Sequence, residues 1–66
     1  MTVAKVIELV GCSPKSWEDA ANEAVKKASK SIRHISGVDV IGQTAVVKNN
    51  KIVEYRANIK IAFGVE

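Results

Sequence analysis

Residues 53–65 read VEYRANIKIAFGV, and two kinds of side chain alternate along this stretch. Apolar residues occupy the odd-numbered positions, whereas Glu54, Arg56, Asn58 and Lys60 occupy even-numbered ones. Successive side chains of a β-strand point to opposite faces of a sheet, so the alternation predicts a strand with one buried face. We expect the odd-numbered face to cover a helix.

A second extended segment, residues 38–48, precedes this strand. Asn49 and Asn50 separate the two segments, and asparagine tolerates the positive φ angles that tight hairpin turns require. The pair therefore predicts a β-hairpin. Gly42 interrupts the earlier segment, and a glycine inside a strand more often marks a bulge or a close backbone approach than a break. We expect the sheet to bend there.

The N-terminal part of the chain predicts a further strand and a turn. Residues 3–10, VAKVIELV, are rich in β-branched and aliphatic side chains, and residues 11–14, GCSP, predict a turn into a helix. Two helix starts fit the sequence. Ser16 with Asp19 resembles a capping box, and Ser13 with Pro14 resembles a cap and first helical residue one turn earlier.

From this point the apolar residues recur at helical spacing and form one stripe: Trp17, Ala20, Ala21, Ala24, Val25, Ala28 and Ile32. The alanines leave little bulk between helix and sheet, so the two backbones can approach closely. We expect Gly37 to end the helix.

Charged residues follow the helix dipole. Acids come first (Glu18, Asp19 and Glu23) and bases come last (Lys26, Lys27, Lys30 and Arg33). Acids near a helix N-terminus and bases near its C-terminus are stabilised by the macrodipole. The basic cluster is thus explained by a solvated helix end, and we expect no nucleic-acid partner.

The composition predicts one small globular domain spanning residues 1–66, since 47% of the residues are hydrophobic and 26% are charged. A domain of this size buries only about 60% of the surface of its unfolded chain, and such domains usually add disulfides, a metal or oligomerisation. Cys12 is the single cysteine and His34 the single histidine, which excludes an intrachain disulfide and falls short of a structural zinc site. We therefore expect oligomerisation.

Cellular location is predicted from two further features. No apolar run approaches the 18 or more residues of a membrane span, so we expect no membrane partner. A lone free thiol is ordinary in the cytosol, and we expect the protein in the cytoplasm.

The predicted fold is α+β, with the order β-α-β-β and a three-stranded antiparallel sheet wrapped around one helix. The second face of this sheet has no partner within the chain. It carries the polar even-numbered side chains of residues 53–65 beside more apolar residues of 38–48, so other subunits are the expected cover.

The sequence contains no glycine-rich phosphate loop, paired catalytic carboxylates or serine-histidine-acid constellation. We expect His34 at the helix end, where a cation or a carbonyl hydrogen bond is structurally reasonable. Cys12 precedes the helix without an associated base, so we interpret it as an inert thiol. The protein is therefore not expected to be an enzyme.

The whole chain resembles the dodecins. The resemblance lies in residues 5–14 (KVIELVGCSP), the alanine-rich helix of residues 17–35, the Val38-Asp39-Val40 segment, and residues 55–63 (YRANIKIAF). No single motif is diagnostic, but length, order and pattern agree together. The resemblance implies a homododecamer, a hollow sphere of twelve copies with cubic 23 symmetry, with flavins bound in stacked pairs between subunits and no catalysis.

The resemblance also places the ligand-binding positions at Gly37, Asp39, Gly42, Gln43 and Arg56. In flavin-binding dodecins a tryptophan after the helix stacks on the isoalloxazine ring, and a glutamine in the last strand binds its pyrimidine edge. This chain has Gly37 and Arg56 at those positions, and Gly42 where the family has an acid that contacts the ribityl chain. Stacking on an aromatic side chain is worth on the order of 1–3 kcal/mol per ring, so we expect weak flavin binding.

Trp17 lies on the helical stripe and is expected to pack in the core or an interface instead of replacing the missing stacking residue. Arg56 has two interpretations. Its planar guanidinium fits an anion such as a flavin phosphate or a coenzyme A phosphate, and it equally fits a salt bridge with Glu54 or Asp39.

Two functions remain open. The first is a non-enzymatic dodecameric shell that binds or stores a small ligand, by resemblance a flavin such as riboflavin or FMN. The alternative is a structural assembly that depends on calcium or another divalent cation and has lost flavin binding, as in dodecin-like chains that lack the tryptophan. Its candidate metal ligands are Asp39, Glu8 and Glu54, which show no dense calcium-loop spacing but are repeated by symmetry in an assembly.

Overall fold

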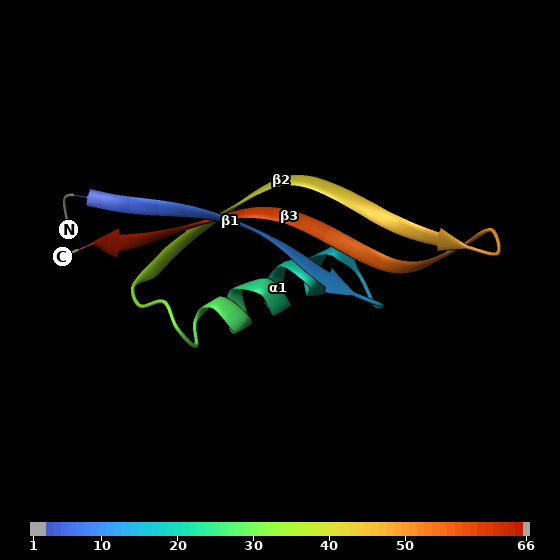
Figure 1. Cartoon of the computed structure of the whole chain (residues 1–66), viewed down its shortest axis with the longest axis horizontal. Coiled ribbons are helices and arrows are strands. Elements are labelled where there is room, and N and C mark those ends of the chain that lie inside the picture. The colour runs from blue at the N-terminus through green and yellow to red at the C-terminus, as the bar shows by residue number, and fades with distance from the viewer. Residues whose placement is uncertain (1–2, 66) are drawn as a thin grey trace.

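The computed structural model describes residues 3–65 and has the order β1 (Val3–Ser13), α1 (Trp17–Ala28), β2 (Ile35–Lys48) and β3 (Lys51–Val65). The three strands form one antiparallel sheet in the order β1-β3-β2, so the last strand of the chain is the central one. Helix α1 lies across one face of this sheet (Figure 1). The predicted β-α-β-β fold is confirmed.

The core lies between α1 and the odd-numbered face of β3. Its buried residues come from the helix stripe and the centre of β3: Ala20, Ala24, Ala28, Ala57, Ile59 and Ile61. Alanine predominates among them, because the helix rests directly on the sheet and leaves room mainly for small side chains. Ile7, Leu9 and Ile32 pack around this centre and are only partly buried.

The helix begins where the capping box predicts. Ser16 is the N-cap, and its hydroxyl oxygen accepts a hydrogen bond of 3.0 Å from the backbone N–H of Asp19. The alternative start at Ser13 is wrong, because Ser13 belongs to β1. Its hydroxyl donates to the Asp19 carboxylate at 2.6 Å and accepts from the backbone N–H of Lys15 at 2.9 Å.

The helix ends at Ala28, earlier than the stripe predicts, and Gly37 does not end it. Ser29 is the C-cap, with its hydroxyl donating to the Lys26 carbonyl at 2.7 Å. His34, at φ 63°, then turns the chain into β2 with a left-handed backbone. Gly37 consequently lies inside β2, opposite Ala62.

Strand β1 continues through the residues where we expected a turn, as far as Ser13 opposite Tyr55. Gly11 explains the continuation. A β-carbon built at Gly11 would overlap the backbone carbonyl of Ala20, so the helix crosses the sheet at a strand position that only glycine can fill.

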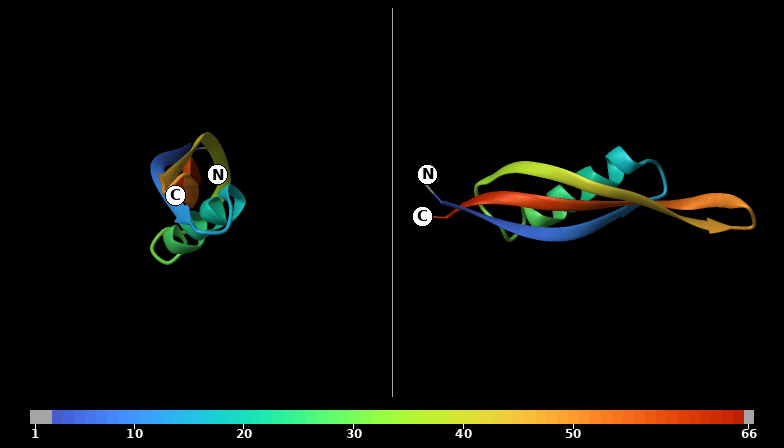
Figure 2. Two further views of the ribbon diagram at one scale, coloured as in Figure 1. Left: turned by 90° about the vertical axis from the view of Figure 1, so that its right-hand side faces the viewer. Right: turned by 90° about the horizontal axis from the view of Figure 1, so that it is seen from above.

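The hairpin of β2 and β3 has both predicted features. Asn49 and Asn50 form the turn with φ values of 52° and 63°. The register shifts between Val40 and Gly42, which places a bulge where the glycine predicts one. The hairpin continues past the end of β1 and past the start of α1 (Figures 1 and 2).

Candidate functional site

The sheet face opposite α1, called the outer face here, holds most of the expected site residues. Directly opposed residues of antiparallel strands share a face, so the even-numbered residues of β3 define its rows. Each row joins β1, β3 and β2. In order along β3 they are Val6, Ala62 and Gly37; Glu8, Lys60 and Asp39; Val10, Asn58 and Gly42; and Cys12, Arg56 and Thr44.

A shallow hollow of about 270 Å³ lies over the first two rows, lined by Val6, Gly37, Val38, Asp39, Lys60 and Ala62. A β-carbon built at Gly37 would meet nothing within 4 Å, so the space above this residue is open. The hollow thus combines small apolar side chains with one carboxylate and one ammonium group. Such a surface accepts a flat apolar ring with a hydrogen-bonding edge.

The structure brings some of the expected ligand-binding residues together and separates others. Gly37 and Asp39 both line the hollow. Gly42 lies one row beyond, with its built β-carbon 3.5 Å from the amide nitrogen of Asn58. Gln43 is opposite Ala57 and therefore lies on the helix side of the sheet, because the bulge at Gly42 changes the facing of β2.

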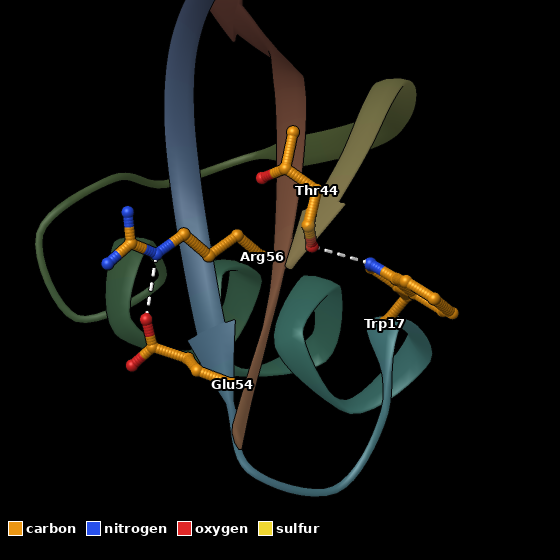
Figure 3. Close-up of polar contacts among 4 residues, drawn as sticks. All are labelled: Trp17, Thr44, Glu54 and Arg56. Atoms are coloured by element: carbon orange, nitrogen blue, oxygen red, sulfur yellow. Dashed lines mark hydrogen bonds and ion pairs between the residues drawn. The ribbon is translucent and has the colours of Figure 1, made fainter. Parts of the chain in front are cut away.

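Arg56 lies three rows from Gly37, about 20 Å along the strand. Its Nε donates to the Glu54 carboxylate at 2.7 Å (Figure 3). This hydrogen bond and the attraction of Glu54 raise the pKa of Arg56 above its ordinary value. Of the two salt-bridge partners considered, Glu54 is the one in contact.

The three metal candidates do not converge. Glu54 pairs with Arg56, whereas Glu8 and Asp39 flank Lys60 from either side. Within residues 3–65, no three acidic, histidine or cysteine side chains gather as a metal site would require. The register places the cationic residue Lys60 between Glu8 and Asp39, and without three converging ligands the described part of one copy does not form a calcium site.

Trp17, expected in the core or an interface, is half-buried at the start of α1 and lies outside the buried core. Its ring meets Tyr55 edge to face with centroids 4.8 Å apart. Its Nε1 donates to the Thr44 carbonyl at 2.8 Å (Figure 3). Cys12 is exposed on the outer face opposite Arg56. Sequence reasoning missed Val6, Ala62 and the role of Lys60 in the hollow, because these residues meet Gly37 and Asp39 only through the strand register.

In the described part of the chain, α1 is too short and too polar to cross a membrane, and no other helix offers a span.

Two relatives match nearly the whole chain in sequence. The calcium dodecin of Mycobacterium tuberculosis is 41% identical over 63 residues, which cover 96% of this chain and 89% of that protein. The dodecin of Thermus thermophilus is 30% identical over 64 residues, covering 97% and 93% of the two chains.

Solved structures agree with these matches. The dodecin of Streptomyces coelicolor superposes with a TM-score of 0.95 at 25% identity, over 100% of this chain and 97% of that chain. The calcium dodecin of M. tuberculosis, which is described with a calcium-binding site, superposes with a TM-score of 0.86 at 38% identity, over 98% and 93%. Residues 3–66 match the family model named Dodecin. A strand order with the last strand in the centre, one alanine-rich helix on one face and this whole-length similarity lead to one conclusion: the chain belongs to the dodecin family.

Proposed function

We propose that the protein is a non-enzymatic subunit of a hollow homododecamer that binds or stores a small planar ligand of the flavin class. The observation that carries the proposal is the open space over Gly37, beside apolar side chains and the charged pair of Asp39 and Lys60. The hollow of about 270 Å³ would give room to a planar ring such as isoalloxazine. Val6 and Ala62 would lie under the ring, and the charged pair would face its polar edge.

The exposed apolar side chains of the fold support self-assembly. Several large apolar residues of β1 and β2 are exposed: Val3, Val6, Val10, Val38, Val40, Ile41 and Val47. So many large apolar side chains exposed on one small fold favour cover by a second copy.

The binding is proposed to be weak, because the hollow is open and Gly37 contributes no ring. Each missing stacking contact removes on the order of 1–3 kcal/mol. Two copies that face each other across a symmetry axis would close the hollow from both sides.

Riboflavin titration combined with native mass tests this proposal. Saturable quenching of flavin fluorescence by a protein peak with the mass of a dodecamer is the expected result. A dodecamer that does not quench riboflavin would contradict ligand binding, and a monomer would contradict the shell itself.

Calcium-dependent assembly is the second candidate, favoured by the 41% identity to a protein named calcium dodecin. Because one copy does not fit calcium, Glu8, Asp39 or Glu54 would have to act together with symmetry-related copies. Under this candidate, a chelator lowers the native mass and added calcium restores it. A mass unchanged by both treatments would contradict it.

A further inference from the structure

The hairpin of β2 and β3 ends in an arm that the rest of the fold leaves unsupported. Strand β1 stops at Ser13 opposite Tyr55, so residues 46–53 form a two-stranded ribbon beyond it. We call residues 46–53 the hairpin arm. It projects past the helix at the turn end of the molecule (Figure 2). A two-stranded ribbon is marginally stable in water by itself, so contacts from outside this fold would stabilise the arm.

The side chains of the arm indicate what those contacts are. Val47, Ile52 and Val53 are 60%, 48% and 44% exposed. At the tip, Lys48 and Lys51 lie directly opposite each other, and like charges in opposed positions repel. An apolar surface with a carboxylate near the two ammonium groups would therefore suit the arm.

The size of the exposed surface points to another chain as the cover. The chain exposes 4878 Å², whereas a compact monomer of 7.1 kDa exposes about 4100 Å². The excess is close to the roughly 800 Å² that each partner buries in a standard interface. The radius of gyration of 13.4 Å likewise exceeds the roughly 11 Å expected for a compact chain of this length.

A groove with matching chemistry lies between β1 and α1. We call it the edge groove. Its volume is about 650 Å³, with apolar walls from Ile7, Leu9, Ala28 and Ile32 and with Glu23, Lys27 and Cys12 also in its lining. Within residues 3–65, β1 is hydrogen-bonded to β3 alone, so the backbone groups along its other edge are unpaired.

The arm cannot fill the edge groove of its own chain. Cys12 is opposite Arg56, and Ile52 is four residues farther along β3, about 13 Å away and beyond the end of β1. We propose that the hairpin arm of one copy occupies the edge groove of a neighbouring copy. Val47 and Ile52 then contact Ile7 and Ile32, and the lysine pair approaches Glu23.

This contact rests on the proposed self-assembly and specifies how two copies meet. The native thiol allows a direct test, because Cys12 is exposed near the end of β1 where it borders the groove, and Ile52 lies on the arm. In the variant Ile52→Cys, mild oxidation or a short bis-maleimide should join the introduced thiol of one chain to Cys12 of another. The distance within one chain exceeds the roughly 7 Å limit for a disulfide, so a disulfide must link two copies. The bis-maleimide has a longer reach, and its product counts only when it has the mass of two or more chains.

Two controls identify the cross-link. Ile52→Cys combined with Cys12→Ser should lose it, and Lys26→Cys, on the helix surface outside the groove, should not form it with Cys12. The product is read as a dimer or higher band under denaturing, non-reducing conditions, with the joined peptides identified by mass. Native mass of the same samples shows whether the copies are assembled.

The outcomes separate the two proposals. An assembled Ile52→Cys protein that gives no product requiring both thiols, with either reagent, overturns the arm contact and leaves self-assembly standing. A monomer before cross-linking, in the unmodified protein as well, overturns both. A product that survives Cys12→Ser comes from two arms meeting each other and also overturns the arm-in-groove contact.

Charge reversal gives an independent readout. Glu23→Lys places another ammonium beside Lys48 and Lys51, and should raise the concentration at which copies dissociate by about tenfold or more. Glu18→Lys, on the same helix but outside the groove, is the matched control. If Glu23→Lys and Glu18→Lys raise the dissociation concentration equally, Lys48 and Lys51 do not lie near Glu23.

Discussion

The indole nitrogen of Trp17 donates a hydrogen bond of 2.8 Å to the backbone carbonyl of Thr44, and so ties the first residue of α1 to strand β2. The helix otherwise lies mainly against β1 and β3. The bond therefore holds the far edge strand to the helix near the point where the hairpin leaves the body of the fold.

Replacing Trp17 by phenylalanine tests this bond. Trp17→Phe keeps an aromatic ring against Tyr55 but removes the donor, and should lower the free energy of unfolding by about 1 kcal/mol. Urea unfolding at a fixed protein concentration measures the change. Trp17→Ala should lose more, because the ring contact is removed as well. An unchanged free energy of unfolding in Trp17→Phe would mean that the hydrogen bond contributes nothing.

Two glycines in strands form a matched pair. Gly11→Ala forces a β-carbon onto the Ala20 carbonyl and should destabilise the fold by about 1–3 kcal/mol. Gly37→Ala adds a β-carbon that meets nothing within 4 Å, so its stability should stay within about 0.5 kcal/mol of the original. Thermal unfolding measures the stability of both variants. Equal losses of stability in the two would contradict the close helix crossing at Gly11.

Restoring a ring at Gly37 should strengthen flavin binding. Gly37→Trp supplies the stacking contact over the hollow, worth on the order of 1–3 kcal/mol, and should raise riboflavin affinity by about fivefold or more. Fluorescence quenching measures the affinity, and Lys30→Trp, outside the hollow, is the control. Unchanged affinity would show that the shape of the site, beyond the missing ring, prevents binding.

The ion pair of Arg56 controls whether this side chain is available to a phosphate. Glu54→Gln removes the bound carboxylate and should increase the preference for FMN over riboflavin, measured as the ratio of the two affinities. The raised pKa of Arg56 stabilises the folded state at every pH below the ordinary value and is lost only as pH rises through the raised one. The ratio should therefore vary with the ionisation of the FMN phosphate and not with that of Arg56.

Lys60 should oppose calcium binding on the outer face. Lys60→Gln removes the ammonium between Glu8 and Asp39, and calcium affinity measured by titration calorimetry should increase. Lys30→Gln changes the net charge equally at a distant position. Equal affinities in the two variants would exclude Glu8 and Asp39 from any calcium site.

The sequence predicts those parts of the fold that local chemistry controls. The alternation of residues 53–65, the Asn49-Asn50 turn, the Gly42 bulge and the Ser16 cap are confirmed because each depends on neighbours in the chain. The end of α1 is different. Ile32 fits the helical stripe, yet the chain leaves the helix after Ala28 and turns at His34 to enter β2.

Prediction from local sequence patterns is limited in the same way for strand β1 and for the candidate site. Gly11 fits a turn by its sequence neighbours, and only the helix crossing above it explains why it lies in a strand. The candidate residues were found one by one, but their neighbours depend on register between strands far apart in the sequence. Lys60 between Glu8 and Asp39, and Gln43 on the helix side, follow from pairings that no local pattern encodes.

The central position of β3 has a consequence for synthesis on the ribosome. Both β1 and β2 hydrogen-bond to β3, which is made after them. Neither edge strand has its partner until residues 51–65 have left the exit tunnel. The sheet therefore forms late, with the nearby hairpin partner β2 expected to pair before the distant β1, and the nascent chain holds its apolar strands unpaired until then.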